Sequence, residues 1–406
     1  MTYKHGVSVK EQATALVPPV RVTTGLPFVV GTAPGPAEGE LPVNDLRLIY
    51  SYKEFVETFG FDEDLETYSL CEFAQVYFGL YNVAPVVFVN VFDPAVHKTG
   101  ETPDPSLVAS ADIIGGIDAG TGKKTGLELI EEVFPKFRLV PGSVVAPGFS
   151  IDPTVAVTMG AKASLINSCF KAQAIVDIPE TVTKYSDVPG YKETNGLTDE
   201  HLIVCWPRIK YGEDKHWMSS HLAGVLSNTD GRFDDVPYKS PSNENFVAIG
   251  AAVGSDEVFL SPDEAAYLNG QGIVTAMNFI GGWKCWGNRT ACYPGVTDVK
   301  DAFICIRRTF NWISNTLVLT AWQKVDAPIR KRLIDTIVDS FNVWLNGLAA
   351  REIILGGRVA FLEEENPTTD VMDGIVRFHL WVTPPSPARE FDFIVEYDPD
   401  YIQGLF

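Results

Sequence analysis

The sequence predicts a multidomain fold that combines an α/β part with an α+β part and carries an extended arm at each end. Apolar runs and amphipathic helical segments alternate through the middle of the chain, which favours βαβ units on a largely parallel sheet. Two long amphipathic helices then precede a final pair of strands, which indicates an α+β block. Strand-like segments also lie close to both termini, where chains usually fray.

The composition is that of a globular, acidic protein. The chain has 406 residues, 46% of them hydrophobic, which suits about two or three domains. Its formal net charge is −20, from 52 acidic and 32 basic side chains, and this argues against nucleic acid or an anionic membrane as the main partner. The six cysteines are scattered without a C-x-x-C pair, so we expect reduced thiols rather than a disulfide scaffold or a zinc site.

Neither a secretion signal nor a membrane span is predicted. The first residues lack the apolar core of a signal peptide. No apolar run approaches the roughly 18 residues that a membrane-spanning helix needs. We therefore expect a protein made and kept in the cytosol, with no direct membrane insertion.

The N-terminal quarter is predicted to hold an arm and part of an outer domain. Residues 1–25 form the arm, with a short alternating segment at 6–11. Residues 26–100 begin the outer domain. Its predicted elements are a strand at 26–31, helices at 52–59 and 70–80, and a continuously apolar strand at 85–91 of the kind that is covered on both faces.

The middle domain, residues 101–281, is predicted to be α/β. Helical and strand patterns alternate there at a spacing that favours a largely parallel sheet. The predicted helices lie at 127–134, 155–170 and 217–226, and the predicted strands at 139–146, 172–178 and 201–206.

The C-terminal inner domain, residues 282–397, is predicted to be α+β. Its helices are expected at 299–322 and 328–348, and we expect Asp326 to cap the second one. A strand follows in which one face carries Val376, Phe378, Leu380 and Val382, and the other Ile375, Arg377, His379 and Trp381.

A second terminal strand follows a proline turn. Pro384, Pro385 and Pro387 break the ladder because proline has no N–H to donate. After them, Phe391, Phe393, Val395 and Tyr397 share one face, and the C-terminal arm 398–406 completes the chain. An unpaired strand at either terminus either pairs within its own chain or adds to the sheet of a neighbour. The alternation fits both arrangements.

No pattern in the sequence identifies an active site, a cofactor or a metal. The segment 120–125 follows a strand-like Asp112–Ile114, but it lacks the early glycine and the Ser or Thr of a phosphate-binding loop. The turn at 146–150 lacks the spacing of a nucleophile elbow. His201, His216 and His221 show no metal-ligand spacing.

A basic cluster stands out in this acidic chain. It consists of Lys324, Arg330, Lys331 and Arg332. Positive charge in the first turn of a helix opposes the helix dipole, so it brings the helix no evident stability. The cluster is either a contact for an acidic partner or a solvated helix face.

In their order along the chain, several segments resemble the contractile tail sheath proteins of phages and phage-derived injection particles. The matching segments are 5–9, 139–150, the Trp-Gly-x-Arg-Thr motif within 282–290, the two-helix block, and the strand, proline turn and strand at the end. The resemblance covers essentially the whole chain. It implies a subtilisin-like middle domain without a working triad.

The resemblance further implies a structural, non-enzymatic subunit that polymerises helically around an inner tail tube, contracts, and contacts baseplate and tail-terminator proteins. Such particles are assembled in the host cytoplasm. The terminal arms of this family exchange between subunits, and its C-terminal domain faces the tube. Here the arms would act through Val7, Ser8, Val9, Phe391, Phe393, Val395, Tyr397, Tyr401 and Leu405, and the tube would contact Lys324, Arg330, Lys331 and Arg332.

Two other functions fit parts of the sequence. A cytosolic α/β enzyme, such as a hydrolase or a nucleotide-binding protein, would use the middle domain and would form a closed oligomer with a ligand pocket. Another viral structural protein, such as a capsid or baseplate component, would share the absence of catalytic motifs.

Overall fold

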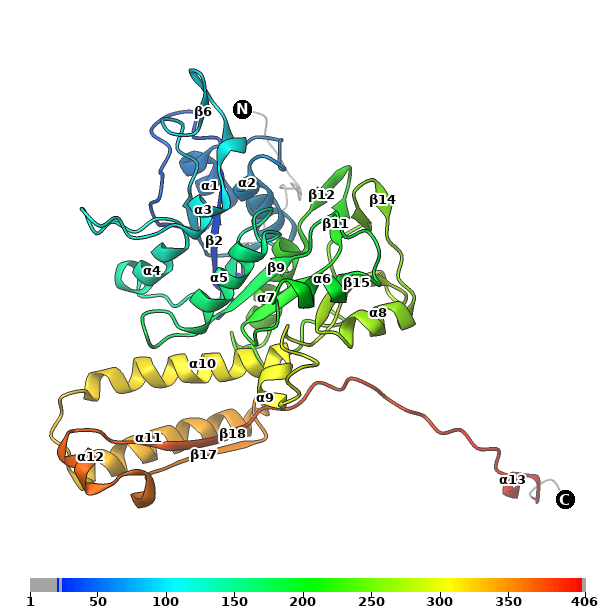
Figure 1. Cartoon of the computed structure of the whole chain (residues 1–406). Coiled ribbons are helices and arrows are strands. Elements are labelled where there is room, and N and C mark those ends of the chain that lie inside the picture. The colour runs from blue at the N-terminus through cyan, green and yellow to red at the C-terminus, as the bar shows by residue number, and fades with distance from the viewer. Residues whose placement is uncertain (1–19, 22–23, 404–406) are drawn as a thin grey trace, which may run out of the picture. The chain divides into compact units, whose positions relative to one another are not determined.

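The computed structural model describes residues 20–21 and 24–403. The chain divides into two compact units, Met1–Ala327 and Pro328–Phe406 (Figure 1). The predicted N-terminal segment 6–11 lies outside the described residues.

The first unit is built on an eight-stranded sheet in the order β16-β15-β10-β9-β8-β2-β5-β3. Its six inner strands run parallel, and the two outermost strands pair antiparallel with their neighbours. In chain order the strands are β2 (Pro27–Gly31), β3 (Arg47–Ile49), β5 (Val86–Asn90), β8 (Ser143–Val145), β9 (Gln173–Asp177), β10 (Leu202–Cys205), β15 (Ile273–Asn278) and β16 (Trp283–Trp286).

Helices follow most of these strands, as the predicted βαβ pattern requires. They are α1 (Tyr52–Phe59), α2 (Ser69–Ala74) with the π-helical Gln75–Leu80, α3 (Ser110–Ile114), α4 (Ile130–Phe137), α5 (Pro153–Ser164), α6 (Val188–Thr194), α7 (Met218–Arg232), α8 (Pro262–Asn269), α9 (Val299–Ala302) and α10 (Ile304–Ala321).

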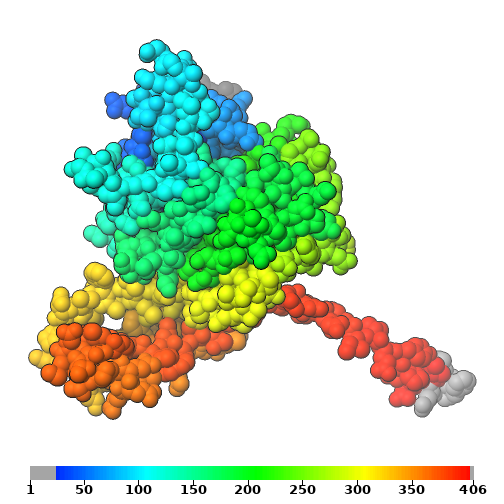
Figure 2. All heavy atoms as spheres, viewed as in Figure 1, coloured from blue at the N-terminus to red at the C-terminus, as the bar shows by residue number. Residues whose placement is uncertain are grey.

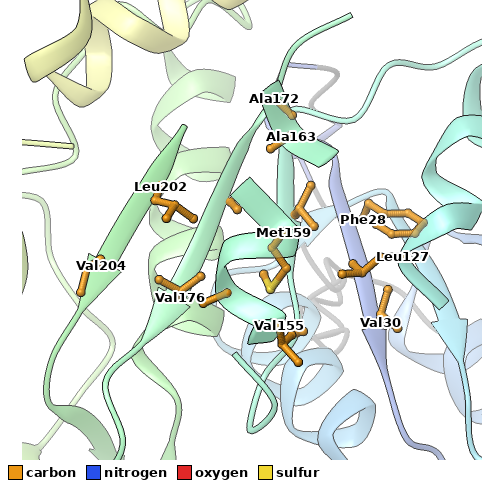
Figure 3. Close-up of a cluster of buried hydrophobic side chains, with 14 of the residues drawn as sticks. Phe28, Val30, Leu127, Val155, Met159, Ala163, Ala172, Val176, Leu202 and Val204 are labelled. Atoms are coloured by element: carbon orange, nitrogen blue, oxygen red, sulfur yellow. The ribbon is translucent and has the colours of Figure 1, made fainter. Parts of the chain in front are cut away.

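Alternate side chains of the parallel strands pack into two different hydrophobic cores. In β2, Phe28 and Val30 enter the core that contains α5, whereas Val29 enters the core that contains α7. Figure 3 shows the first core, with Val155 and Met159 of α5 lying against the strands. Because both faces are covered, every residue of β2, β5 and β9 is buried, which explains why their central residues are apolar.

Three smaller sheets complete the first unit. Four antiparallel strands lie in the order β12-β11-β13-β14, and two pairs, β1–β4 and β6–β7, stand apart. The bounds are β1 (Val20–Arg21), β4 (Val83–Ala84), β6 (Lys98–Thr99), β7 (Thr102–Pro103), β11 (Arg208–Tyr211), β12 (Asp214–His216), β13 (Gly250–Val253) and β14 (Asp256–Glu257).

The second unit packs one long helix on a two-stranded antiparallel sheet. The helix α11 (Lys331–Ala350) buries Phe341, Leu345 and Leu348, which follow one another at helical spacing. The strands are β17 (Gly356–Ala360) and β18 (His379–Thr383), with α12 (Thr368–Met372) between them and α13 (Asp400–Gln403) near the end of the chain.

The mixed α/β fold class is confirmed, with strands of the predicted segments 26–100 and 101–281 joined in one sheet. The two helices predicted for the C-terminal domain do not lie in one unit: α10 belongs to the first unit and α11 to the second. The finer boundaries at 25, 100, 281 and 397 stay predictions.

Three local predictions were wrong. Asp112–Ile114 is helical, because the Asp112 carboxylate accepts the Ala109 N–H and so caps a short helix. Asp326 does not cap α11, which begins after Arg330. The helix predicted at 299–322 is interrupted at Phe303, whose extended backbone forms a bridge with Arg289.

Candidate inter-subunit and tube-facing surfaces

The segment that follows β18 is an exposed arm. No helix or strand is formed between Thr383 and α13, and Figure 1 shows the segment as extended chain. The predicted strand residues Phe391, Phe393, Val395 and Tyr397 are 75% to 91% exposed. Figure 2 shows the arm as a narrow row of spheres.

Such exposure of aromatic and β-branched side chains is typical of surfaces at which proteins bind partners. Ile394, which points to the opposite face in a strand, is 92% exposed as well, so the arm has no core of its own. The alternative that this strand pairs within its own chain is not observed among the described residues. Tyr401 lies in α13 and is also exposed, whereas Leu405, Val7, Ser8 and Val9 lie outside the described residues.

The arm is also strongly acidic. One basic residue, Arg389, precedes a series of carboxylates on alternate or nearby positions. These are Glu390, Asp392, Glu396, Asp398 and Asp400. A surface that receives the arm should therefore combine apolar and cationic groups.

The β17–β18 sheet has such a combination on one face. The guanidinium of Arg358 lies 4.2 Å from the centroid of the Trp381 ring, and Trp381 stacks on His379 at 4.0 Å. His379 Nδ1 lies 2.6 Å from a carboxylate oxygen of Glu365. The sequence predicted that His379 and Trp381 share a face, but not that Arg358 joins them from another strand.

The opposite face of this sheet packs on α11. Val359 and Leu380 lie opposite each other, as do Gly357 and Val382. A side chain at Gly357 would approach Leu345 of α11 to 3.3 Å, so this face is the apolar one. A groove of about 370 Å³ runs along residues 355–358 and 381–383.

The basic residues lie exposed, in two different units. Lys324 ends a short 3-10 helix of the first unit, whereas Arg330, Lys331 and Arg332 begin α11 in the second. No ion pair to any of them is found among the described residues. The structure therefore brings three of the four predicted tube-facing residues together at one helix end.

A buried polar cluster lies at the N-terminus of α7, and we call it the α7 cap cluster. The Trp217 N–H donates to Glu72 Oε1 and the Ser220 hydroxyl to Glu72 Oε2, at 2.9 and 2.7 Å. The Ser219 N–H donates to Asp177 Oδ1 at 2.9 Å. Two carboxyls thus satisfy the free N–H groups of a buried helix end.

Burial sets the proton affinities in this region. It raises the pKa of Glu72 to about 8 and that of Asp177 to about 6. The hydrogen bonds that the two carboxyls accept lower these pKa values, but by less than burial raises them. Burial also lowers the pKa of His216 to about 4 and holds that of His221 well below its usual value. His221 lies between His216 and the Tyr81 hydroxyl, at 3.2 and 3.0 Å.

Serine, histidine and aspartate are the residue types of a hydrolase, but here they are enclosed. Ser219, His221 and Asp177 are at most 3% exposed. A substrate cannot reach them without unfolding α7, so the α7 cap cluster holds the fold together. Sequence reasoning missed it because its members come from α2, β9 and the start of α7, far apart along the chain.

The described parts of the chain give little support to an enzyme, a metal-binding protein or a membrane-spanning protein. A cavity of about 280 Å³ is lined mainly by the 138–142 loop and by residues of α10, and its lining holds no Ser, Cys, His, Asp or Glu. Residues 20–21 and 24–403 hold no cluster of three or more His, Cys, Asp and Glu that could bind a metal. No helix among them is long and apolar enough to span a membrane.

Comparisons with known proteins point to one class. No family model matches the chain. A tail sheath protein of Burkholderia phage BcepMu is 27% identical over 324 residues, which cover 77% of this chain and 66% of that protein, just under two thirds. A prophage major tail sheath protein, described as putative, from Pseudomonas aeruginosa UCBPP-PA14 is 28% identical and covers 99% of this chain and 98% of its own length.

Solved structures agree in fold. A chain of the anti-feeding prophage baseplate superposes with a TM-score of 0.69 at 17% identity, covering 98% of this chain and all of its own. A chain of the contracted sheath complex of the extracellular contractile injection system PVC gives 0.66 at 16% identity, with 99% coverage of both. The predicted resemblance to contractile tail sheath proteins is thereby confirmed.

Proposed function

We propose that the chain is the structural subunit of a contractile tail sheath, which polymerises helically and contracts to drive an inner tube through a target envelope. The observation that carries this is alignment over nearly the whole chain, at 28% sequence identity with a putative prophage tail sheath protein and in fold with a contracted sheath. The enclosed α7 cap cluster supports a role without catalysis.

The arms would connect the polymer. An arm that buries nothing in its own chain gains its stability only when a neighbouring subunit covers it. Because the giving and receiving surfaces differ, each contact leaves a free arm and a free receiver, and assembly continues as an open helix. We assign this role to Phe391, Phe393, Val395, Tyr397 and Tyr401, and to Val7, Ser8, Val9 and Leu405 of the terminal segments.

Imaging of the purified chain by negative-stain electron microscopy tests this assignment against the two rivals. A sheath subunit forms hollow tubular polymers, whereas an α/β enzyme forms monomers or small closed oligomers. Another viral structural protein would give shells or plates. Removing residues 1–15 or 398–406 should abolish the tubes and leave a folded monomer with unchanged circular dichroism.

The basic end of α11 is our candidate for the tube contact. Its three exposed cations have no partner among the described residues, and an exposed ion pair is weak enough to be released when the sheath contracts. The proposed partners are therefore further copies of this chain, an inner tube protein, and baseplate and terminator proteins in a phage tail or a related particle assembled in the host cytoplasm.

We expect charge reversal at Arg330, Lys331 and Arg332 to weaken association with the tube protein by about tenfold, because three repulsive contacts replace three attractive ones. Co-sedimentation with tube protein measures this. Reversal at Lys53 and Lys239, lysines of the first unit outside the proposed contact, is the control. Unchanged tube association, or loss of tube-free polymers, would contradict the assignment.

A further inference from the structure

A cavity lies at the amino ends of three neighbouring parallel strands in the first unit. Its volume is about 280 Å³, and it is lined by residues just before β2, β8 and β9 and by residues of α10. Asn315 of α10 fixes this wall, because its Oδ1 accepts the Lys171 N–H and its Nδ2 donates to the Lys171 carbonyl, both at 2.9 Å. The cavity is therefore a fixed part of the first unit, and we call it the cationic cavity.

The charge of the cavity is positive. Its lining includes Arg138, Lys171 and Arg308 but no carboxylate. Arg308 is neutralised by the buried Asp230, to which both of its terminal nitrogens donate. Arg138 and Lys171 form no ion pair within the described part of the chain. Two cations of the lining are therefore left without a counter-charge from their own described chain.

The surroundings of Lys171 favour an anionic group in the cavity. Burial lowers the pKa of Lys171, and the positive charges of Arg307 and Lys300 lower it further. A carboxylate beside Lys171 would oppose these effects, because it stabilises the charged ammonium group. Other parts of the lining are apolar and include the half-buried Trp312 and the exposed Leu319. The group that fits this cavity thus combines a carboxylate with an apolar side chain.

A short segment between α1 and α2 has this combination, and we call it the acidic loop. It consists of four exposed residues, Phe61, Asp62, Glu63 and Asp64. Its three carboxylates form no ion pair with any described residue, whereas the nearby Glu66 is paired with Arg208. The Asp64 N–H donates to Asp62 Oδ1 at 2.9 Å, which orders the loop before any partner binds. A preordered loop loses little conformational entropy on binding.

The acidic loop and the cationic cavity lie at opposite ends of the main sheet. The Thr32 hydroxyl donates to the Thr67 carbonyl at 2.7 Å, and the Gly35 N–H donates to the Phe59 carbonyl at 2.8 Å. These bonds hold both sides of the loop beyond the carboxyl end of β2, whereas the cavity lies at its amino end. Figure 1 shows α1 and α2 on the opposite side of the first unit from α10. Because the five residues of β2 span roughly 16 Å, the loop cannot enter the cavity of its own chain.

A second copy of the chain is the partner that this pair of surfaces fits. Assembly brings together chains of net charge −20, so a contact that pairs free cations with carboxylates offsets part of their repulsion. Other exposed acidic segments match the cavity less well. Residues 36–42 hold no aromatic side chain, and Glu257, close to Phe259, is already paired with Lys210.

Resting on the sheath function proposed above, we infer that the acidic loop of one copy enters the cationic cavity of a second copy. The carboxylates of the loop pair with Arg138 and Lys171, and Phe61 covers the apolar wall beside Trp312. Because the loop and the cavity are different surfaces at opposite ends of the sheet, the contact is head to tail and repeats along an open assembly. It joins the first units directly and does not involve either terminal arm.

Charge reversal on each side, alone and in mixture, tests this contact. The cavity variant is Arg138→Glu with Lys171→Glu, and the loop variant is Glu63→Lys with Asp64→Lys. Either variant alone should raise the protein concentration needed for polymerisation about tenfold, measured by sedimentation, because attractive pairs become repulsive. An equal mixture of the two should return to within about twofold of the unsubstituted chain, because each loop can then meet a cavity of opposite charge.

Matched reversals elsewhere on the first unit are the controls. Lys123→Glu with Lys184→Glu changes the net charge as the cavity variant does, and Glu38→Lys with Glu40→Lys changes it as the loop variant does. All four side chains are exposed. Each control should polymerise within about twofold of the unsubstituted chain.

A direct cross-link examines the same contact without any substitution. Carbodiimide condenses an amine and a carboxylate that touch into an amide, with loss of water to the reagent. In polymers made from isotope-labelled and unlabelled chains, mass spectrometry should find Lys171 joined to Glu63 or Asp64 of a different copy. A link within one copy, or no such link in intact polymers, would overturn the contact.

The remaining outcomes separate this contact from the sheath function. Cavity and loop variants that polymerise at the unsubstituted concentration would overturn the contact and leave the sheath function standing. Folded variants that fail alone and also fail in mixture would overturn it as well. An unsubstituted chain that forms no polymers would contradict both the contact and the sheath function.

Discussion

At the scale of single residues, the most consequential groups are buried ones that no sequence motif marks. Glu72 and Asp177 occupy the end of a helix where a hydrogen-bond acceptor is required, and they do so inside the core. Glu72 lies in a helical stretch that the sequence predicts correctly, but an acid on a helix is ordinarily exposed. Its burial depends on the approach of α7, which lies about 145 residues away in the chain.

The α7 cap cluster makes stability depend on pH. Burial raises the pKa of Glu72 from 4.5 to about 8, so the folded chain holds this proton more tightly than the unfolded chain does. The stabilisation is fully present below pH 4.5 and is lost as the pH rises through 8. Burial lowers the pKa of His216 from 6.5 to about 4, so its contribution has the opposite sign and is lost as the pH falls through that range.

We expect Glu72→Gln to match the unsubstituted chain near pH 5 and to be more stable at pH 9 by about 2 to 4 kcal/mol. The uncharged amide can accept the Trp217 N–H through its oxygen and donate from its NH2 group to the Ser220 hydroxyl. Urea unfolding of the two proteins across this pH range, under conditions that keep them monomeric, gives the difference. The exposed Glu63→Gln is the control and should show no such trend. A constant difference from pH 5 to pH 9 would mean that Glu72 is already ionised in the fold.

At the scale of elements, the local sequence pattern predicted the helices and strands correctly where burial in the core or a helix cap determines them. The helix Tyr52–Phe59 has the predicted bounds, because Ser51 caps it and Gly60 ends it. The strands β2, β5 and β9 lie where continuous apolar runs place them. These elements carry their own signals in sequence.

The predicted elements differ from the observed ones where a residue far away in the sequence determines the local backbone. The interruption at Phe303 depends on Arg289, whose guanidinium lies 3.7 Å from the centroid of the Phe303 ring and whose backbone bridges to it. Likewise, nothing in the sequence predicts that the Asn342 side chain bonds both the N–H and the carbonyl of Val359 in β17. The alternation of the arm predicts a strand, but only a partner can supply its hydrogen bonds.

For the arm we expect Ile394→Pro to abolish polymerisation without changing the thermal unfolding of the monomer. Proline removes an N–H in the middle of the strand, whereas the side chains of residues 391–397 are exposed and add little to the stability of their own chain. Sedimentation and differential scanning fluorimetry measure the two effects. Ser386→Pro, within the existing proline run, is the matched control and should polymerise normally; equal loss in both variants would point to stiffening of the linker instead.

At the scale of the whole molecule, the chain combines a rigid unit with two well-packed cores and a small unit that is left incomplete. The first unit buries its main sheet on both faces, while the second carries an arm whose side chains are exposed. The order of segments along the chain resembles that of contractile tail sheath proteins, and the comparisons confirm this resemblance. The division after Ala327, which separates α10 from α11, could not be predicted, because both helices have the same amphipathic pattern.

The measurement that tests this account most directly is a cryo-electron microscopy reconstruction of the polymer that the purified chain forms. The account predicts a hollow helical tube in which residues 389–397 of one subunit form a strand against a neighbouring subunit. A polymer in which each arm folds back on its own subunit, or a chain that forms only closed oligomers, would contradict it.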